Sequence, residues 1–307
     1  MNTNSIKSSN APQQLFANGV GILVGLSAFC IILMVTIMMG IVVYNGAAHV
    51  TWEFLTTTPK SGMTEGGIFP AIYGTAMLTI IMAIAVVPVG AMTAIYMHEY
   101  ARGRVVELIR TAVHNLAGVP SIVFGLFGLG FFIMFVGRQL DAILYSGGPV
   151  WGQPCILWAA LTLALLTLPV VVVATEEALR AVPMAYREAS LALGATKWQT
   201  TWKVVVPRAL PGIFTGGILS VSRGAGEVAP ILFTGAAYFL PDLPKHLNSQ
   251  FMELGYHVYV MSTQSVNVDA TRPLQFATTL VLLVLTFILN FTAIILRSRI
   301  RKSVGMG

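Results

Sequence analysis

Long apolar stretches constrain the fold of this chain more than any other feature. A helix that crosses a hydrocarbon core of ~30 Å needs roughly 20 apolar residues. Five stretches meet this requirement, residues 20–44, 68–97, 119–136, 156–175 and 274–296. A sixth, residues 209–237, is interrupted by Arg223 and Glu227 and is counted as a span. With 56% apolar and only 10% charged residues, we predict an all-α polytopic membrane protein with six transmembrane helices.

The Lys and Arg residues are distributed unevenly between the predicted loops. With the N-terminus inside, 13 of the 18 lie on the cytoplasmic side and Arg223 lies in a span. The four on the outer side are Lys60, Arg138, Lys245 and Arg272. The positive-inside rule therefore predicts that both termini are cytoplasmic. The net charge of +6 reflects this topology and gives no support for nucleic-acid binding.

Signals for other classes of protein are weak. The first apolar stretch exceeds the ~7–15 apolar residues of a signal peptide and follows a single cation, Lys7, so we interpret it as an uncleaved anchor. Cys30 and Cys155 show no CxxC or metal-ligand spacing and are expected to be buried, inert thiols. The five histidines are remote from one another in sequence, which favours surface or interfacial positions over a metal site. GxxxxGK[ST] does not occur, so the chain by itself is not expected to bind a nucleotide in the P-loop manner. The nucleophile-elbow pattern GxSxG is also absent, and the signals for an enzyme are weak.

One long polar segment, REASLALGATKWQTTWKVVVP at residues 187–207, separates the fourth and fifth spans. Pro183 favours a helix start, and Gly194 suits a C-terminal cap in the left-handed region. Thr196 and Gln199 have the spacing of a capping box, which predicts a second helix. Pro207 is expected to end or kink that helix. The segment therefore predicts a helix, a Gly-containing turn and another helix.

The residues of the first predicted helix leave two interpretations open. Arg187, Glu188, Met184 and Leu191 share one side, whereas three alanines lie on another. Such a helix could rest on lipid headgroups, with Trp198 and Trp202 as interfacial aromatics. Alternatively, its mixed face is a docking surface for another protein.

The spacing within this segment carries a family resemblance. Glu188-Ala189-Ser190, three residues, Gly194, nine residues and Val204-Val205-Val206-Pro207 resemble the EAA loop of ABC-importer permeases, with Ser190 in place of the second Ala. The resemblance implies a coupling helix that docks into an ATPase subunit on a separate chain. It would place ATP and magnesium on that partner and no cofactor on this chain. The implied coupling residues are Arg187, Glu188, Ala189, Ser190, Leu191 and Gly194.

Four further segments narrow the resemblance to the phosphate branch. TPKSGMTEGGIFPAIYGTAML, PSIVFGLFGLGFF, REASLALGATKWQT and SRGAGEVAPILFTGAA are similar to the A-type (PstA) permeases of bacterial phosphate importers, from about residue 52 to the C-terminus. The resemblance implies a type I ABC importer permease fold in the bacterial inner membrane. It also implies phosphate as substrate, a PstB-like ATPase dimer, a PstC-like second permease and a PstS-like periplasmic binding protein.

Arg223 and Glu227 are the second feature that points to function. Their spacing of four places them on one face of a helix, and neither charge can face lipid. A structural ion pair between neighbouring helices remains one interpretation. The other is a translocation site, because a guanidinium offers fixed donors to oxyanion oxygens and Glu227 can compete for it once the anion has left. The family resemblance implies the second role for both residues.

The residues around this pair predict a loosened helix. Gly224, Gly226 and Pro230 weaken helical structure and can free backbone amides, as in the discontinuous helices of transporters. Gly216, Gly217, Ser220 and Gly224 form a strip of small residues that predicts close helix packing.

The predicted organisation follows from these spans and motifs. It comprises a cytoplasmic tail (1–16), a first span with its periplasmic loop (17–66), a permease core (67–297) with the coupling loop at 176–208, and a basic cytoplasmic tail (298–307). Two functional alternatives remain, namely an ABC permease for another oxyanion such as sulfate or molybdate, and an ATP-independent channel or secondary transporter.

Overall fold

The computed structural model describes residues 11–60, 63–144, 148–265 and 267–303. Parts of both predicted tails, residues 1–10 and 304–307, lie outside the described residues. Within the described chain, six helical segments are long and apolar enough to cross a membrane, which confirms the predicted number of spans. They are Gly19–His49, Phe69–Tyr100, Ser121–Leu144, Ile156–Arg180, Lys197–Gly224 and Val268–Arg299.

The spans are assembled from α-helices with the π-helical insertions η3, η4 and η5, and the first span ends in the 3-10 helix η1. In chain order the first half comprises α1 (Ala11–Gly46), η1 (Ala47–His49), α2 (Trp52–Thr56), β1 (Pro59–Lys60), β2 (Glu65–Gly66), α3 (Phe69–Ile95), η3 (Tyr96–Tyr100), α4 (Arg104–Ala117), α5 (Ser121–Phe127), η4 (Gly128–Gly137) and α6 (Arg138–Leu144). The second half comprises α7 (Ile156–Arg180), α8 (Met184–Ala192), α9 (Lys197–Thr200), η5 (Thr201–Val205), α10 (Val206–Gly224), α11 (Leu254–Thr263) and α12 (Val268–Ser303).

The segment between the first two spans is more ordered than a plain loop. It contains α2 and the antiparallel pair β1–β2. Gly66 lies in β2, paired with Pro59, and has a φ of +84°, a backbone conformation that glycine adopts without the steric cost of a Cβ.

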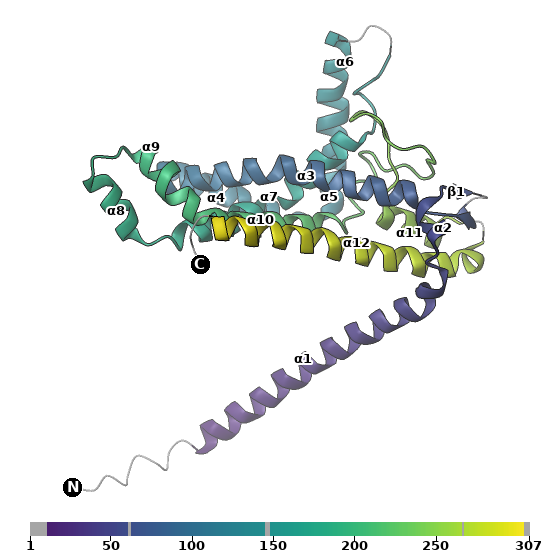
Figure 1. The fold of residues 1–307 in the computed structure, drawn as a ribbon, viewed down its shortest axis with the longest axis horizontal. Coiled ribbons are helices and arrows are strands. Elements are labelled where there is room, and N and C mark those ends of the chain that lie inside the picture. The colour runs from purple at the N-terminus through teal and green to yellow at the C-terminus, as the bar shows by residue number, and fades with distance from the viewer. Residues whose placement is uncertain (1–10, 61–62, 145–147, 266, 304–307) are drawn as a thin grey trace.

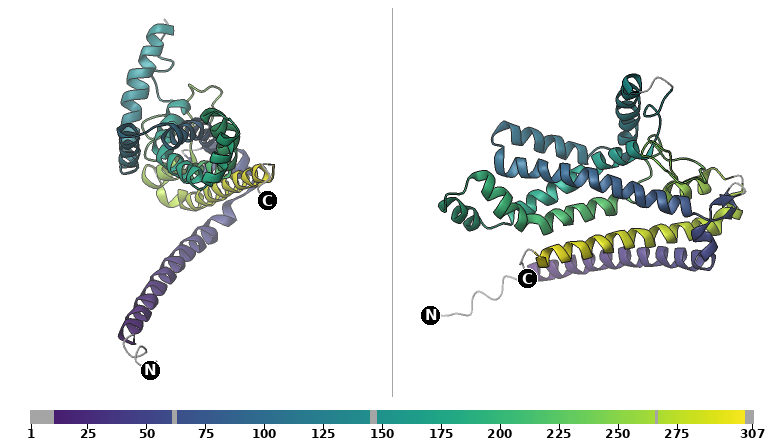
Figure 2. Two further views of the ribbon diagram at one scale, coloured as in Figure 1. Left: turned by 90° about the vertical axis from the view of Figure 1, so that its left-hand side faces the viewer. Right: turned by 45° about the horizontal axis from the view of Figure 1, so that its top comes forward.

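Helices α3, α7 and α10 form the centre of a bundle, and α12 packs along α10. The α8 end of the bundle carries α8 and α9, and the opposite α11 end carries α2 and α11 (Figure 1). Helix α1 contacts α12 but leans away from the bundle, while α5, η4 and α6 project from it at a steep angle (Figures 1 and 2). Large apolar surfaces of α1 and α12 are therefore left to lipid or to other chains.

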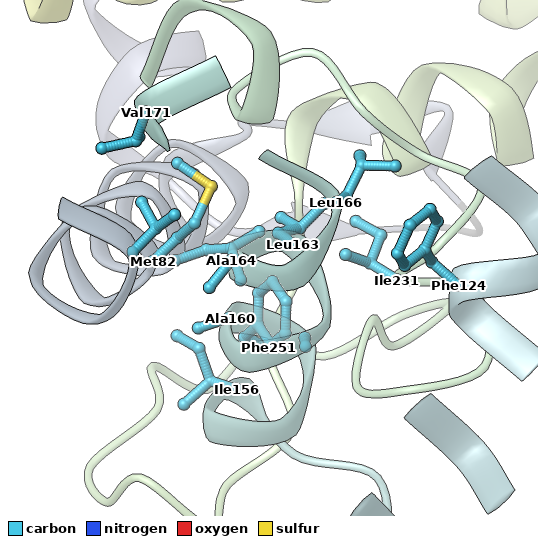
Figure 3. Packing of buried hydrophobic residues seen from close by; sticks show 13 residues of the cluster. Met82, Phe124, Ile156, Ala160, Leu163, Ala164, Leu166, Val171, Ile231 and Phe251 are labelled. Carbon is cyan, nitrogen blue, oxygen red and sulfur yellow. The ribbon is translucent and has the colours of Figure 1, made fainter. Parts of the chain in front are cut away.

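The core lies between α3 and α7. Met82 of α3 packs among α7 residues that include Ala164 and Val171 (Figure 3). Phe251 and Ile231 join the same cluster from segments that are not helical. The core therefore fixes the position of the irregular chain that follows α10.

The predicted fifth span, residues 209–237, is wrong in its bounds. Helix α10 ends at Gly224, and residues 225–237 continue as turns and irregular chain. Two glycines close together and Pro230 disfavour helix here. Backbone hydrogen bonds to distant segments replace those of a helix. The carbonyl oxygen of Thr234 accepts from the amide of Cys155, and the amide of Ala237 donates to the carbonyl oxygen of Phe251.

Two of the predicted environments are also wrong. Cys30 is exposed on α1, whereas Cys155 is buried as expected. His257 lies on α11 and is 2% exposed, rather than at a surface. Both errors arise because burial depends on which helices pack together, which sequence spacing does not reveal.

Candidate translocation site and coupling hairpin

Helix α10 ends about halfway along its neighbours. A side chain at Gly224 would overlap Met82, and Thr167 lies just beyond. Met82 is near the middle of α3 and Thr167 is near the middle of α7. The chain then continues toward the α11 end without helical structure. If α3 and α7 cross the bilayer, the break in α10 therefore lies near its middle.

Arg223 and Glu227 meet at this break. Arg223 Nε lies 3.5 Å from Glu227 Oε1. Arg223 is in the last turn of α10, but Glu227 lies beyond the helix. The backbone amide of Glu227 donates to Gly224 O, which closes a turn. The predicted contact between Arg223 and Glu227 is therefore present. Contrary to the prediction, the two residues do not lie on one face of a helix but meet because the chain turns directly after the end of α10.

The pair lies on a side of α10 that this chain leaves open. The Arg223 side chain is 45% exposed and that of Glu227 is 22% exposed. Leu219 and Ser222 share this face of α10 by helical spacing and are exposed, and Gly226, just beyond the helix, is exposed as well. Charges at this depth cannot face hydrocarbon without a large cost. The open side must therefore face a water-filled path or another protein.

Asn290 is a polar neighbour of this site that the sequence reasoning missed. It lies on α12, and its Nδ2 donates to Ser222 Oγ at 3.2 Å. Its Oδ1 is buried without a hydrogen-bond partner among the described residues. In the sequence, Asn290 is an amide side chain within the otherwise apolar final span. Because polar groups in membrane helices face protein or water, this feature could have marked it as part of a polar site.

The strip of small residues packs α10 closely against its neighbours, as predicted. A Cβ at Gly216 would lie 3.0 Å from Ala174 Cβ, and one at Gly217 would lie 3.1 Å from Val87. Ser220 is fully buried. These close contacts with α3 and α7 hold the end of α10, and hence Arg223, at a fixed depth.

The chemistry of the break suits a tetrahedral oxyanion. A guanidinium presents several N–H donors in a fixed plane, and a nearby carboxylate prevents it from holding an anion permanently. At 3.5 Å the Arg223–Glu227 contact is longer than a normal charged hydrogen bond. An incoming anion therefore has only a loose ion pair to displace.

The α8–α9 hairpin forms as the local signals predict. Gly194 has a φ of +82°, and its amide donates to Leu191 O while Ala195 N donates to Ser190 O. These two bonds define a Schellman cap. Gln199 N donates to Thr196 Oγ1 and Thr196 N donates to Gln199 Oε1, which completes the capping box. The turn geometry is therefore specified by the sequence of the hairpin itself.

Pro207 does not end the second helix of the hairpin. Helix α9 continues through the π-helical η5 into α10, and Pro207 lies in the first turn of α10. A π-helical insertion widens the turn that precedes the proline, which lacks an amide to donate. The hairpin is thus directly continuous with the helix that carries Arg223.

Arg187 points into the protein rather than away from it. Its Nη2 donates to Glu99 Oε1 and to Leu179 O, both at 2.9 Å, and its Nη1 donates to Val182 O at 2.7 Å. The Arg187 side chain is only 11% exposed. It ties α8 to the ends of α7 and η3, a position that suits a brace.

The other predicted coupling residues have different surroundings. Ser190 Oγ lies 2.9 Å from Thr200 Oγ1 and links the two arms of the hairpin. Glu188, Ala189 and Leu191 are exposed, and Leu193 is 89% exposed. The hairpin therefore presents a surface of small and apolar side chains around one acidic residue.

Residues 86–302 match the family described as binding-protein-dependent transport system inner membrane component. A probable ABC transporter permease of Bacillus subtilis, YqgI, is 32% identical over 80% of this chain and 84% of its own length. The phosphate transport system permease PstA of Mycobacterium leprae is 41% identical over 64% of this chain. PstA 1 of Mycobacterium tuberculosis is 45% identical over 54% of this chain. These matches cover only 61% and 50% of the two PstA relatives.

Two solved transporters share the fold. A bacterial alginate ABC transporter, in complex with a periplasmic protein, superimposes with a TM-score of 0.63 over 92% of this chain and 96% of the matched chain, at 15% identity. The MetNI methionine ABC transporter superimposes with a TM-score of 0.57 over 75% of this chain and 94% of the matched chain, at 17% identity. The architecture is therefore that of ABC transporter permeases.

Proposed function

Since this chain belongs to the binding-protein-dependent transport system inner membrane components, we propose that it is a permease subunit of an ATP-driven importer of inorganic phosphate. It supplies half of the translocation pathway in the inner membrane. A second, PstC-like permease covers the open side of α10 and completes the path. Both termini are cytoplasmic, as the distribution of Lys and Arg favours.

The observation that carries this proposal is the ion pair at the end of α10. Arg223 and Glu227 lie at mid-depth, where the helix stops, on a side that this chain does not cover. Discontinuous helices near the midplane form the substrate sites of transporters. Because α10 presents its C-terminal end here, which carries the negative end of the helix dipole, the guanidinium of Arg223 has to supply the attraction for an anion. The single chain thus has one wall of a polar path, which requires a second wall.

Two observations favour phosphate as the anion. An arginine donates to several oxygens of a phosphate at once. Several relatives with 41–45% identity are phosphate transport permeases by name. In the proposed cycle a PstS-like periplasmic binding protein delivers phosphate, Arg223 receives it, and Glu227 reclaims the guanidinium as the anion leaves.

ATP hydrolysis takes place on a separate, PstB-like ATPase dimer, which also holds ATP and magnesium. The exposed surface of α8 around Glu188, Ala189 and Leu191 docks into that dimer. Arg187, Ser190 and Gly194 keep the hairpin in the shape that docks. Because α9, η5 and α10 are continuous, a displacement of the hairpin by the ATPase moves the helix that carries Arg223.

Replacement of Arg223 by Gln tests the translocation site. We expect Arg223→Gln to abolish ATP-dependent uptake of labelled phosphate while the tagged chain still co-purifies with its ATPase and second permease. Arg272→Gln, which removes an exposed arginine outside the path, is the matched control and should retain uptake. Loss of complex assembly in Arg223→Gln, or undiminished uptake, would contradict the assignment.

A further inference from the structure

A polar cavity of about 690 Å³ lies between α4, η3 and the end of α7, at the α8 end of the bundle. We call it the α4 cavity. Its charged lining consists of Arg102, Arg110 and Arg180 together with Glu107 and Glu176. Three cations against two anions leave the cavity positive. Neither Arg223 nor Glu227 lines it, and no residue of α8 or α9 does, so neither the proposed pathway nor the coupling hairpin uses it.

Glu176 holds two of these arginines in place. Arg110 Nη2 lies 2.5 Å from Glu176 Oε1, and Arg180 Nη2 lies 3.3 Å from the same oxygen. The Glu176 side chain is only 11% exposed, whereas Arg110 and Arg180 remain 44% and 68% exposed. One carboxylate neutralises one of two guanidiniums, each of which has five N–H donors. The arrangement is therefore preorganised for a second anion with several oxygens.

Helix α4 has an apolar side opposite this charged one. Val105, Leu108 and Ala112 are exposed at helical spacing, and Leu108 is 72% exposed. The polar residues that line the cavity, including Arg110 and His114, lie on the other side of the same helix. A free anion would use only the polar side. A phospholipid uses both, because its phosphate and its acyl chains are one molecule.

We propose that the α4 cavity binds the phosphate group of an anionic phospholipid of the cytoplasmic leaflet. Arg110 and Arg180 donate to the phosphate oxygens, while the acyl chains extend past the edge of α4 to its apolar side at Val105 and Leu108. The cytoplasmic leaflet carries anionic lipid, and arginines near its surface attract it. Free inorganic phosphate shares the same oxygen chemistry, so the experiment includes both sources.

Photocrosslinking in the assembled complex tests this site. The complex, purified with its partner chains, is placed in phosphatidylcholine nanodiscs that contain a phosphatidylglycerol analogue with a photoreactive headgroup. We expect crosslinks in the peptides that contain residues 102–114 and 176–180, with a yield several-fold above that of an equally labelled phosphatidylcholine. Millimolar inorganic phosphate should leave this yield unchanged.

Charge-matched variants separate the cavity from general attraction to basic residues. Arg110→Gln with Arg180→Gln should lower the phosphatidylglycerol yield to that of phosphatidylcholine. Arg297→Gln with Arg299→Gln, at the α8 end of α12 but outside the cavity, should retain it. Equal yields for the two lipids in the wild type overturn the proposal, even where the double variant fails to assemble. A loss of lipid crosslinking in the presence of inorganic phosphate also overturns the proposal. Crosslinks confined to other helices overturn it too, which would be the result if an ATPase subunit covered the cavity. None of these readouts depends on phosphate uptake.

Discussion

At the residue scale, Arg187 and Glu188 are sequence neighbours in opposite surroundings. Arg187 is held by Glu99 and by the carbonyls at the end of α7, whereas Glu188 is exposed on α8. The resemblance to the EAA loop implies that both are coupling residues, but the contacts separate them. Arg187 is suited to hold the hairpin, and Glu188 to meet a partner.

This separation predicts different consequences for two alanine variants. Arg187→Ala leaves Glu99 and two carbonyls without their donor, so the free energy of unfolding should fall on the order of 3 kcal/mol. Glu188→Ala should change stability by less than about 0.5 kcal/mol but weaken co-purification of the ATPase. Thermal unfolding in detergent and pull-down of the ATPase measure the two effects. Similar melting temperatures for both variants would mean that Arg187 is not a brace.

Glu253 and His257 of the α11 region predict a pH dependence. Glu253 caps α11 by accepting from the amides of Gly255 and Tyr256 at 2.8 and 2.6 Å. Burial raises the pKa of Glu253 to about 7, although the hydrogen bonds from Gly255, Tyr256 and the Thr75 side chain act to lower this pKa. Burial lowers the pKa of His257 to about 4. The two shifts have opposite consequences for stability.

Between pH 4.5 and 7 the folded state keeps a proton on Glu253 that the unfolded state loses, so this group makes stability fall as pH rises. Between pH 4 and 6.5 the unfolded state protonates His257 and the folded state does not, so this group makes stability rise. We expect the two slopes to cancel from pH 4.5 to 6.5. Glu253→Gln should then leave a rising profile and His257→Gln a falling one.

Hydrogen exchange of the α11 amides, corrected for intrinsic rates, measures these profiles. The wild type should be nearly flat over the shared window. If both single variants were as flat as the wild type, the buried titrations would not govern the stability of α11.

At the scale of elements, the sequence predicted local geometry better than helix ends. The hairpin was predictable because Gly194, Thr196 and Gln199 satisfy backbone groups within a few residues of themselves. The end of α10 was not predictable, because the chain beyond it forms its hydrogen bonds with Cys155 and Phe251, which are distant in sequence. Likewise, Arg187 faces Glu99, which lies 88 residues away. Contacts of that range leave no periodic signal.

The Schellman cap predicts a conformational requirement at Gly194. Open space surrounds it, so only its positive φ restricts substitution. Gly194→Asn should be tolerated, because Asn adopts this region. Gly194→Val should strain the cap and reduce both ATPase association and uptake, measured by co-purification and labelled phosphate. The assignment of the hairpin as a coupling element fails if the Val variant retains both.

Close packing of α10 predicts a contrast between two glycines. A Cβ at Gly212 would overlap Ala178 of α7, whereas nothing lies within 4 Å of a Cβ at Gly226. Gly212→Val should therefore lower the melting temperature of the complex, by the ~1–3 kcal/mol typical of overpacking. Gly226→Ala should leave it nearly unchanged. Equal effects would show that α10 is not held through its small residues.

At the scale of the whole molecule, the chain is an incomplete transport path. Its charged pair is open on one side, and its hairpin exposes apolar residues that a monomer in water would bury. Composition and charge distribution were sufficient to predict six spans, because bilayer thickness fixes their length. They could not indicate the open side, which depends on how α3, α7, α10 and α12 pack.

The most direct test is uptake of labelled phosphate by proteoliposomes that contain the complex purified through this chain. We predict uptake that requires ATP on the ATPase side and the periplasmic binding protein, and that excess sulfate or molybdate does not compete away. The chain reconstituted alone should transport nothing. ATP-independent transport by the single chain, or equal competition by sulfate, would contradict the account.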